Sequence, residues 1–172
     1  SSPGSISRVG DEWVMALQSY PIEQGSVHGS DRSALWLSRS HDLVRWSVPE
    51  QVVVAGEQHP PRRIDPFLVE TDDGYVLLHK TAGELHALVS PDLRDWRAAG
   101  RVLGTSDLPD GVTIENPAVV RIDDGYRLFF SPCRPGRGIG VADGADPLRW
   151  RGVRYLDLQS PGWAAGGLTA AT

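Results

Sequence analysis

The chain repeats one sequence pattern three times, and this repeat limits what it can fold into. Each copy has a short apolar segment around an Asp-Gly or Gly-Asp pair, followed by an aspartate and, four residues later, a tryptophan. The pairs are Gly10–Asp11, Asp73–Gly74 and Asp124–Gly125, and the tryptophans are Trp46, Trp96 and Trp150. The tryptophans are 50 and 54 residues apart. A repeat of this length predicts several copies of one small structural unit.

Short strands make up each unit. Apolar and polar residues alternate over brief runs, which is the pattern of half-buried strands. The runs span residues 12–17, 33–37, 51–54, 66–70, 74–78, 85–89, 117–120, 125–130 and 138–141. The 19 glycines and 13 prolines are scattered between runs, which favours tight turns over long helices. The sequence therefore predicts an all-β chain of propeller blades, each with about three clear strands and a weaker fourth at its edge.

The two repeated elements predict the turns within a blade. Gly and Asp tolerate positive φ, so the Asp-Gly element is expected to join the innermost strand to the second. The Asp-x-x-x-Trp element is expected to precede the outer strand. Its aspartate would cap a turn and its tryptophan would pack between blades, so the element has no predicted catalytic role.

The predicted blades cover approximately residues 1–57, 58–110 and 111–172 of a single propeller domain or fragment. Closed propellers have about four to eight blades. An open third blade would expose an unpaired edge and an apolar face. We therefore expect either a missing segment of chain or an association with other subunits to complete the ring.

Composition excludes several classes of partner. The 172 residues are 40% hydrophobic, with a net charge of −5 and no basic block, so a nucleic-acid surface is not predicted. No apolar run approaches a membrane span, and no signal peptide is visible, which leaves the compartment undetermined. The one cysteine, Cys133, excludes an internal disulfide and makes no metal site alone. No metal or cofactor is predicted, and a carbohydrate is the expected ligand.

Two carboxylates are predicted at the mouth of the propeller channel. Asp65 and Glu115 each begin an innermost strand, about 8 residues before an Asp-Asp-Gly turn. Residues at equivalent positions on adjacent blades converge near the axis, and two acids that meet there repel, so at least one pKa should rise. A glutamic acid kept protonated in this way is the proton donor that glycosidic bond cleavage needs. In the alternative interpretation, both residues only cap turns before prolines.

A family resemblance rests on these residues. The segments 63–67, 90–96 and 115–117 make the chain resemble the five-bladed β-propeller glycoside hydrolases. These comprise the arabinanase and xylosidase family 43 and the related invertase and levansucrase families. The resemblance covers nearly the whole chain, as the first three of five blades. It implies hydrolysis of furanosides or pentopyranosides.

The resemblance also implies roles for single residues. Glu115 matches the general acid, and Asp65 matches the aspartate that tunes this acid or steadies the transition state. The remaining carboxylate, a base or nucleophile, belongs at the start of the first innermost strand. There the chain reads Ser1 to Ile6, and no acid occurs before Asp11. The base lies upstream, or another group replaces it, or the protein binds sugar without cleaving it.

Three further residues are predicted to bind substrate. His59, Arg62 and Arg63 lead into Asp65, where they suit sugar hydroxyls or a carboxylate-bearing sugar. Alternatively, they are loop residues in solvent. Three functions are therefore open: a glycosidase, a propeller that binds sugar without catalysis, and a propeller that presents its loops to a protein partner.

Overall fold

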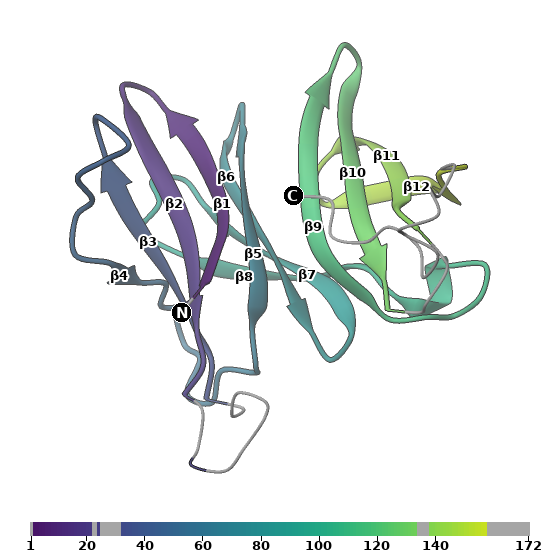
Figure 1. Cartoon of the computed structure of the whole chain (residues 1–172), viewed down its shortest axis with the longest axis horizontal. Helices are drawn as coiled ribbons and strands as arrows, with labels where there is room; N and C mark the ends of the chain where they lie inside the picture. The colour runs from purple at the N-terminus through teal and green to yellow at the C-terminus, as the bar shows by residue number, and fades with distance from the viewer. Residues whose placement is uncertain (1, 22–23, 25–31, 134–137, 158–172) are drawn as a thin grey trace.

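The computed structural model describes residues 2–21, 24, 32–133 and 138–157, so the end of the third predicted blade lies outside the described residues. The described chain forms three four-stranded antiparallel sheets and one 3-10 turn (Figure 1). The first sheet holds β1 (Ser2–Val9), β2 (Glu12–Ser19), β3 (Ala34–Ser40) and β4 (Glu50–Gln51). The second holds β5 (Ile64–Thr71), β6 (Gly74–Thr81), β7 (Glu84–Ser90) and β8 (Arg97–Leu103). After the 3-10 turn η1 (Thr105–Asp107), the third holds β9 (Ile114–Ile122), β10 (Gly125–Pro132), β11 (Gly140–Asp146) and β12 (Arg149–Tyr155).

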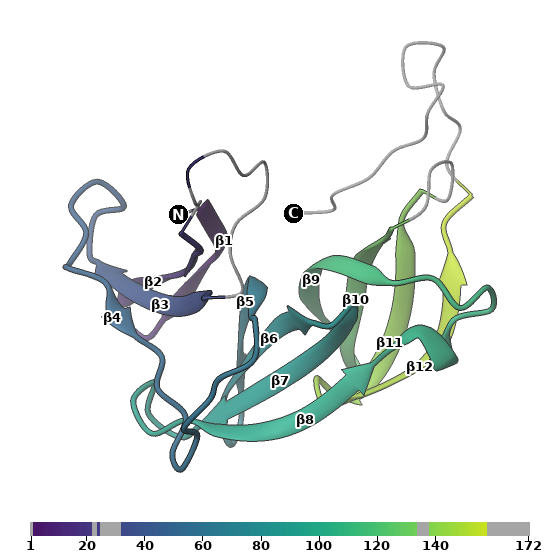
Figure 2. The same cartoon turned by 90° about the horizontal axis from the view of Figure 1, so that it is seen from below.

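Each sheet is a simple meander, in which consecutive strands are neighbours. The sheets follow one another around an arc, with β1, β5 and β9 on its inner side (Figure 2). Two serines of β1 join the first sheet to the second, because Ser5 Oγ accepts a bond from Leu68 N at 2.9 Å and Ser7 Oγ donates to Leu68 O at 2.9 Å. The all-β blade architecture predicted from the repeat is therefore confirmed.

The repeated turns have the predicted form. Each Asp-Gly element joins the first strand of its sheet to the second. In the Asp-x-x-x-Trp element, Asp42 Oδ1 accepts the backbone N–H groups of residues 44 and 45, and Asp92 Oδ1 accepts those of residues 94 and 95. The leucine after each aspartate takes the left-handed conformation, with φ of 62° at Leu43 and 63° at Leu93. The same local sequence therefore makes the same strained turn twice, and the aspartate compensates the strain.

Apolar side chains fill the two spaces between sheets. One core cluster joins the first and second sheets and includes Leu37, Leu77 and Trp96. The other joins the second and third sheets, and Trp150 packs against it. Trp96 and Trp150 thus lie between blades as predicted. Trp46 is only partly buried. By analogy with Trp96 and Trp150, it lies on the face of the first sheet that is turned away from the second sheet.

One predicted strand is mostly wrong. Of residues 51–54 only Gln51 is in a strand, and Val54 instead bridges to Trp96 of the second sheet. The Ala55 amide also bonds to Trp96 O at 3.2 Å, so this segment leaves its own sheet to reach the next. In the described part of the chain, no helix is long and apolar enough to cross a membrane.

Candidate functional site

The inner strands β5 and β9 both begin with a bulge in front of a proline. Asp65 has φ of 54° and Asn116 has φ of 50°, and Pro66 and Pro117 follow them. Asp and Asn are the non-glycine residues that most readily adopt this left-handed conformation. The bulge turns the start of each strand out of the regular ladder, and such bulges are common beside functional sites.

The pairing of these strands with their neighbours corrects the prediction that Asp65 and Glu115 occupy equivalent positions. Ile64 pairs with Lys80 and Glu115 pairs with Ser131, so Glu115 corresponds to Ile64. Asp65 corresponds instead to Asn116, one residue later. The predicted match was wrong by one residue, because Asp65 and Glu115 are not the same distance from their Asp-Gly turns. The prolines that follow Asp65 and Asn116 mark the true alignment.

The first strand fits the same register. Ser2 pairs with Gln18, as Ile64 pairs with Lys80, so Pro3 takes the place of Asp65. Gly4 follows it and lies so close to Pro66 that an added Cβ would clash with the Pro66 backbone and ring. The two bulges therefore pack directly together, and this requires glycine at position 4.

The structure nevertheless brings Asp65 and Glu115 to one place. The amide of Asn116, the residue after Glu115, donates to Asp65 Oδ2 at 3.3 Å. Gln18 of the first sheet accepts a hydrogen bond from the Asp65 amide. Burial is the largest effect and raises the pKa of the Asp65 carboxyl; the Asn116 hydrogen bond opposes it, the Glu115 charge adds to the rise, and Lys80 and Gln18 lower the pKa slightly. Asp65 thus resists ionisation.

Lys80 is a site residue that the sequence analysis missed. It follows the four buried residues of β6, its side chain is 14% exposed, and its ammonium donates to Glu115 Oε1. Burial of Glu115 favours the protonated acid, but the hydrogen bond and charge of Lys80 outweigh it, so the pKa of Glu115 lies below its usual value. The predicted rise therefore occurs at Asp65 and not at Glu115. The signal available in the sequence was a lysine directly after the run of residues 76–79, near the end of a predicted strand.

Cys133 lies beside this ion pair. Its Sγ is 4.0 Å from Lys80 Nζ, and its amide donates to Thr113 O at 2.9 Å. Burial raises the pKa of the thiol, and the Glu115 charge adds to the rise. The sulfur is therefore a thiol at neutral pH and a weak nucleophile.

The three residues predicted to bind sugar lie in three different surroundings. Arg62 lies near Glu115, where its charge acts on the carboxyl, and it lines a hollow of about 330 Å³ together with Lys80. Arg63 is only 7% exposed and binds Glu57 with both terminal nitrogens, at 2.8 and 2.7 Å. His59 is exposed in the loop before β5. Successive residues of an extended chain point to opposite sides, which explains why only Arg62 joins the acidic pair.

His79 shows the same alternation. It precedes Lys80 on β6 and is 2% exposed, stacked on His86 at 6.0 Å between ring centroids. Burial, together with the charge of Arg63, lowers the pKa of His79 to about 3. This neutral histidine pair belongs to the opposite face of the sheet from the Lys80 ammonium.

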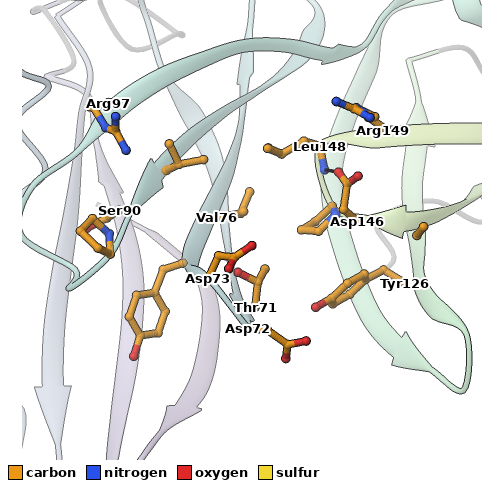
Figure 3. Close-up of a pocket in the computed structure, with 15 residues that line it drawn as sticks. Thr71, Asp72, Asp73, Val76, Ser90, Arg97, Tyr126, Asp146, Leu148 and Arg149 are labelled. Carbon is orange, nitrogen blue, oxygen red and sulfur yellow. Dashed lines mark hydrogen bonds between the residues drawn. The ribbon is translucent and has the colours of Figure 1, made fainter.

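A larger hollow of about 510 Å³ lies between the second and third sheets (Figure 3). Asp72, Asp73, Tyr126, Asp146 and Arg149 line it. It adjoins the end of β5 that is remote from Asp65, so it is separate from the acidic pair. Among the described residues, no group of three or more His, Cys, Asp or Glu side chains is placed to hold a metal ion.

The sequence matches no protein-family model and no curated protein. Its structure is similar to several solved glycoside hydrolases. The α-L-arabinofuranosidase of Clostridium thermocellum has a TM-score of 0.68 over 92% of this chain and 56% of its own, at 14% identity. The GH32 β-fructofuranosidase of Bombyx mori has 0.66 over 91% and 34%, at 21% identity. A family 117 glycoside hydrolase of Zobellia galactanivorans has 0.65 over 91% and 55%, at 15% identity.

These similarities establish the fold. The three sheets match part of the five-bladed propellers of glycoside hydrolases, as the sequence resemblance implied. The chain spans 34 to 56% of the length of these three structures. At identities below 25%, a shared fold does not by itself carry a shared activity.

Proposed function

We propose that this chain is part of a carbohydrate-active protein, a glycoside hydrolase that acts on furanosides or pentopyranosides where Asp65 and Glu115 meet. One observation carries the proposal. A partly buried aspartate with a raised pKa and an ion-paired glutamate lie together at the starts of adjacent inner strands. Pairs of acids with pKa values pushed apart are typical of acid and base roles.

In this proposal Glu115 is the proton donor and Asp65 tunes it, an assignment that follows the family resemblance, because the pKa directions of the unliganded protein by themselves favour Asp65 as the protonated acid. The unliganded protein holds Glu115 as a carboxylate, because Lys80 binds it. Donation therefore requires that substrate draw the Lys80 ammonium away. Burial would then raise the pKa of Glu115.

A second function, sugar binding without cleavage, is favoured by one specific observation. The place of Asp65 is taken in β1 by Pro3, and the described residues of that strand include no carboxylate. Without a base or nucleophile, hydrolysis falls by orders of magnitude while the binding pocket persists. A propeller that binds only a protein partner is the third alternative, and it predicts no sugar binding.

The test compares leaving groups. Glu115→Gln should slow hydrolysis of an unactivated arabinoside or xyloside far more than that of the nitrophenyl glycoside, which scarcely needs a proton donor. Glu70→Gln, an exposed position on β5, is the matched control and should leave both rates unchanged.

Equal rates for Glu115→Gln and the parent on the unactivated glycoside would exclude Glu115 as the acid. Binding of arabinose, xylose or fructose oligosaccharides with no turnover would establish the second function instead. Absence of both binding and turnover would leave the protein-binding alternative.

A further inference from the structure

Arg62 and Lys80 line the same hollow. Its other lining residues are uncharged and include Ile64 and the Ala82–Gly83 turn. Two of the lining residues are therefore cationic and none is acidic. Lys80 is also ion-paired with Glu115.

Arg62 also carries an unsatisfied donor. Its Nε is buried and has no hydrogen-bond partner among the described residues. A guanidinium stays charged at all accessible pH values and only donates, so this N–H needs an acceptor, and the described residues supply none. Buried polar groups are rarely left unpaired, and an exception is a reason to look for a ligand.

Lys80 has donors to spare. Its ammonium carries three N–H groups, of which one binds Glu115 and another faces the weak acceptor Cys133 Sγ at 4.0 Å. These two contacts leave the third N–H for a ligand.

The wall is held in place before a ligand arrives. Thr81 Oγ1 donates to Arg62 O at 3.1 Å and thereby anchors the arginine backbone. Ala82 and Gly83 form a two-residue hairpin turn with φ of 51° and 83°. Gly83 O accepts the Ile114 amide at 2.9 Å, which ties this turn to the strand that bears Glu115. A preorganised pair of cations binds an anion with little ordering cost.

We infer that this hollow binds an oxyanion, either the carboxylate of a sugar acid or inorganic phosphate, beside Glu115. A carboxylate or phosphate accepts several charge-assisted hydrogen bonds from Arg62 and Lys80 at once, which a neutral hydroxyl does not. The sugar-acid source rests on the proposed carbohydrate function, whereas the phosphate source does not.

The experiment is calorimetric titration of the protein with methyl glucuronide, methyl glucoside and inorganic phosphate. The two glycosides differ only in a carboxylate against a hydroxymethyl group. We expect glucuronide to bind at least about tenfold more tightly than glucoside, or phosphate to bind alone, with affinity falling at high salt. Glucuronide preference identifies the sugar acid, and phosphate binding without that preference identifies phosphate.

Variants decide whether the hollow is responsible. Arg62→Gln should weaken anion binding about tenfold or more, and Lys80→Gln should weaken it further, since that variant also frees the Glu115 charge. Arg121→Gln removes an exposed cation from the far end of β9 and should change nothing. Circular dichroism of each variant checks that it is folded.

Two results would overturn the inference: no preference for either anion, or anion binding that Arg62→Gln leaves intact. Different results would overturn the proposed carbohydrate function and the oxyanion site. If glucoside and glucuronide bind equally and phosphate does not bind, the sugar site stands and the oxyanion site falls. If phosphate binds through Arg62, and neither these glycosides nor arabinose, xylose or fructose oligosaccharides bind, the oxyanion site stands and the carbohydrate function falls.

Discussion

Lys80 donates a hydrogen bond to Oε1 of Glu115 and so joins β6 of the second sheet to the first residues of the third. The pair determines the charge state of the carboxyl. Because Glu115 is 41% exposed, solvent screens the pair, and its importance is for protonation rather than for stability.

Replacement of Lys80 by methionine should therefore raise the pKa of Glu115. Burial already favours the protonated carboxyl, and the variant removes the hydrogen bond and charge that oppose burial. Carboxyl ¹³C shifts followed against pH will measure this pKa. The exposed pair Arg121–Asp72 supplies the control, since Arg121→Met should leave the Glu115 titration unchanged. An unaltered Glu115 titration in Lys80→Met would show that the ion pair does not form in solution.

Asp65→Asn should increase the free energy of unfolding at neutral pH. The folded-state pKa of Asp65 is raised, so the stability it contributes is complete below the unfolded value of about 3.9 and is lost as pH rises through the folded value. Asparagine keeps the acceptor for the Asn116 amide and tolerates the positive φ. Urea unfolding at neutral pH and near pH 3.5 will show whether the gain disappears on acidification.

The control for Asp65 is Asp72→Asn, a change at a carboxylate that is 87% exposed. It should alter stability little at either pH. A loss of stability in Asp65→Asn at neutral pH would contradict the predicted cost of burying this charge. A stabilised variant that is also inactive would indicate that Asp65 is retained for function at the expense of stability.

The buried His79 should make the protein less stable in acid. Its pKa of about 3 lies below the ordinary 6.5, so its contribution is complete above pH 6.5 and is lost as pH falls toward 3. Across this window each such group adds a slope of at most about 1.4 kcal/mol per pH unit. His79→Gln should flatten the dependence between pH 6.5 and 4 in urea titrations, whereas His59→Gln, at an exposed loop position, should not.

Trp96 should be the tryptophan on which the assembly of the first two sheets depends. It is 2% exposed in their shared core, so Trp96→Ala should lower the free energy of unfolding by about 3–5 kcal/mol. Trp46 has the same place in its own repeat but is only partly buried, and Trp46→Ala should cost clearly less. Equal losses in denaturant unfolding would mean that another surface covers Trp46.

Local sequence determined the blades. Asp42 and Asp92 cap their turns with the same two backbone bonds, because the geometry needs only residues that are adjacent in the chain. The Asp-Gly elements and the alternating runs likewise act over a few residues. For this reason the repeat was sufficient to predict three four-stranded sheets, and the resemblance to part of a five-bladed propeller was confirmed.

Tertiary structure decided which side chains meet. Lys80 reaches Glu115 from 35 residues away, and Gln18 reaches Asp65 from 47, across boundaries between sheets that no local pattern describes. Arg62 and Arg63 are neighbours in sequence, yet one lies beside the acids and the other is buried against Glu57. Ionisation follows these contacts, because burial and the nearest charge set each pKa. The sequence therefore determined where the two acids enter the fold, and only packing between blades decided which of them resists ionisation.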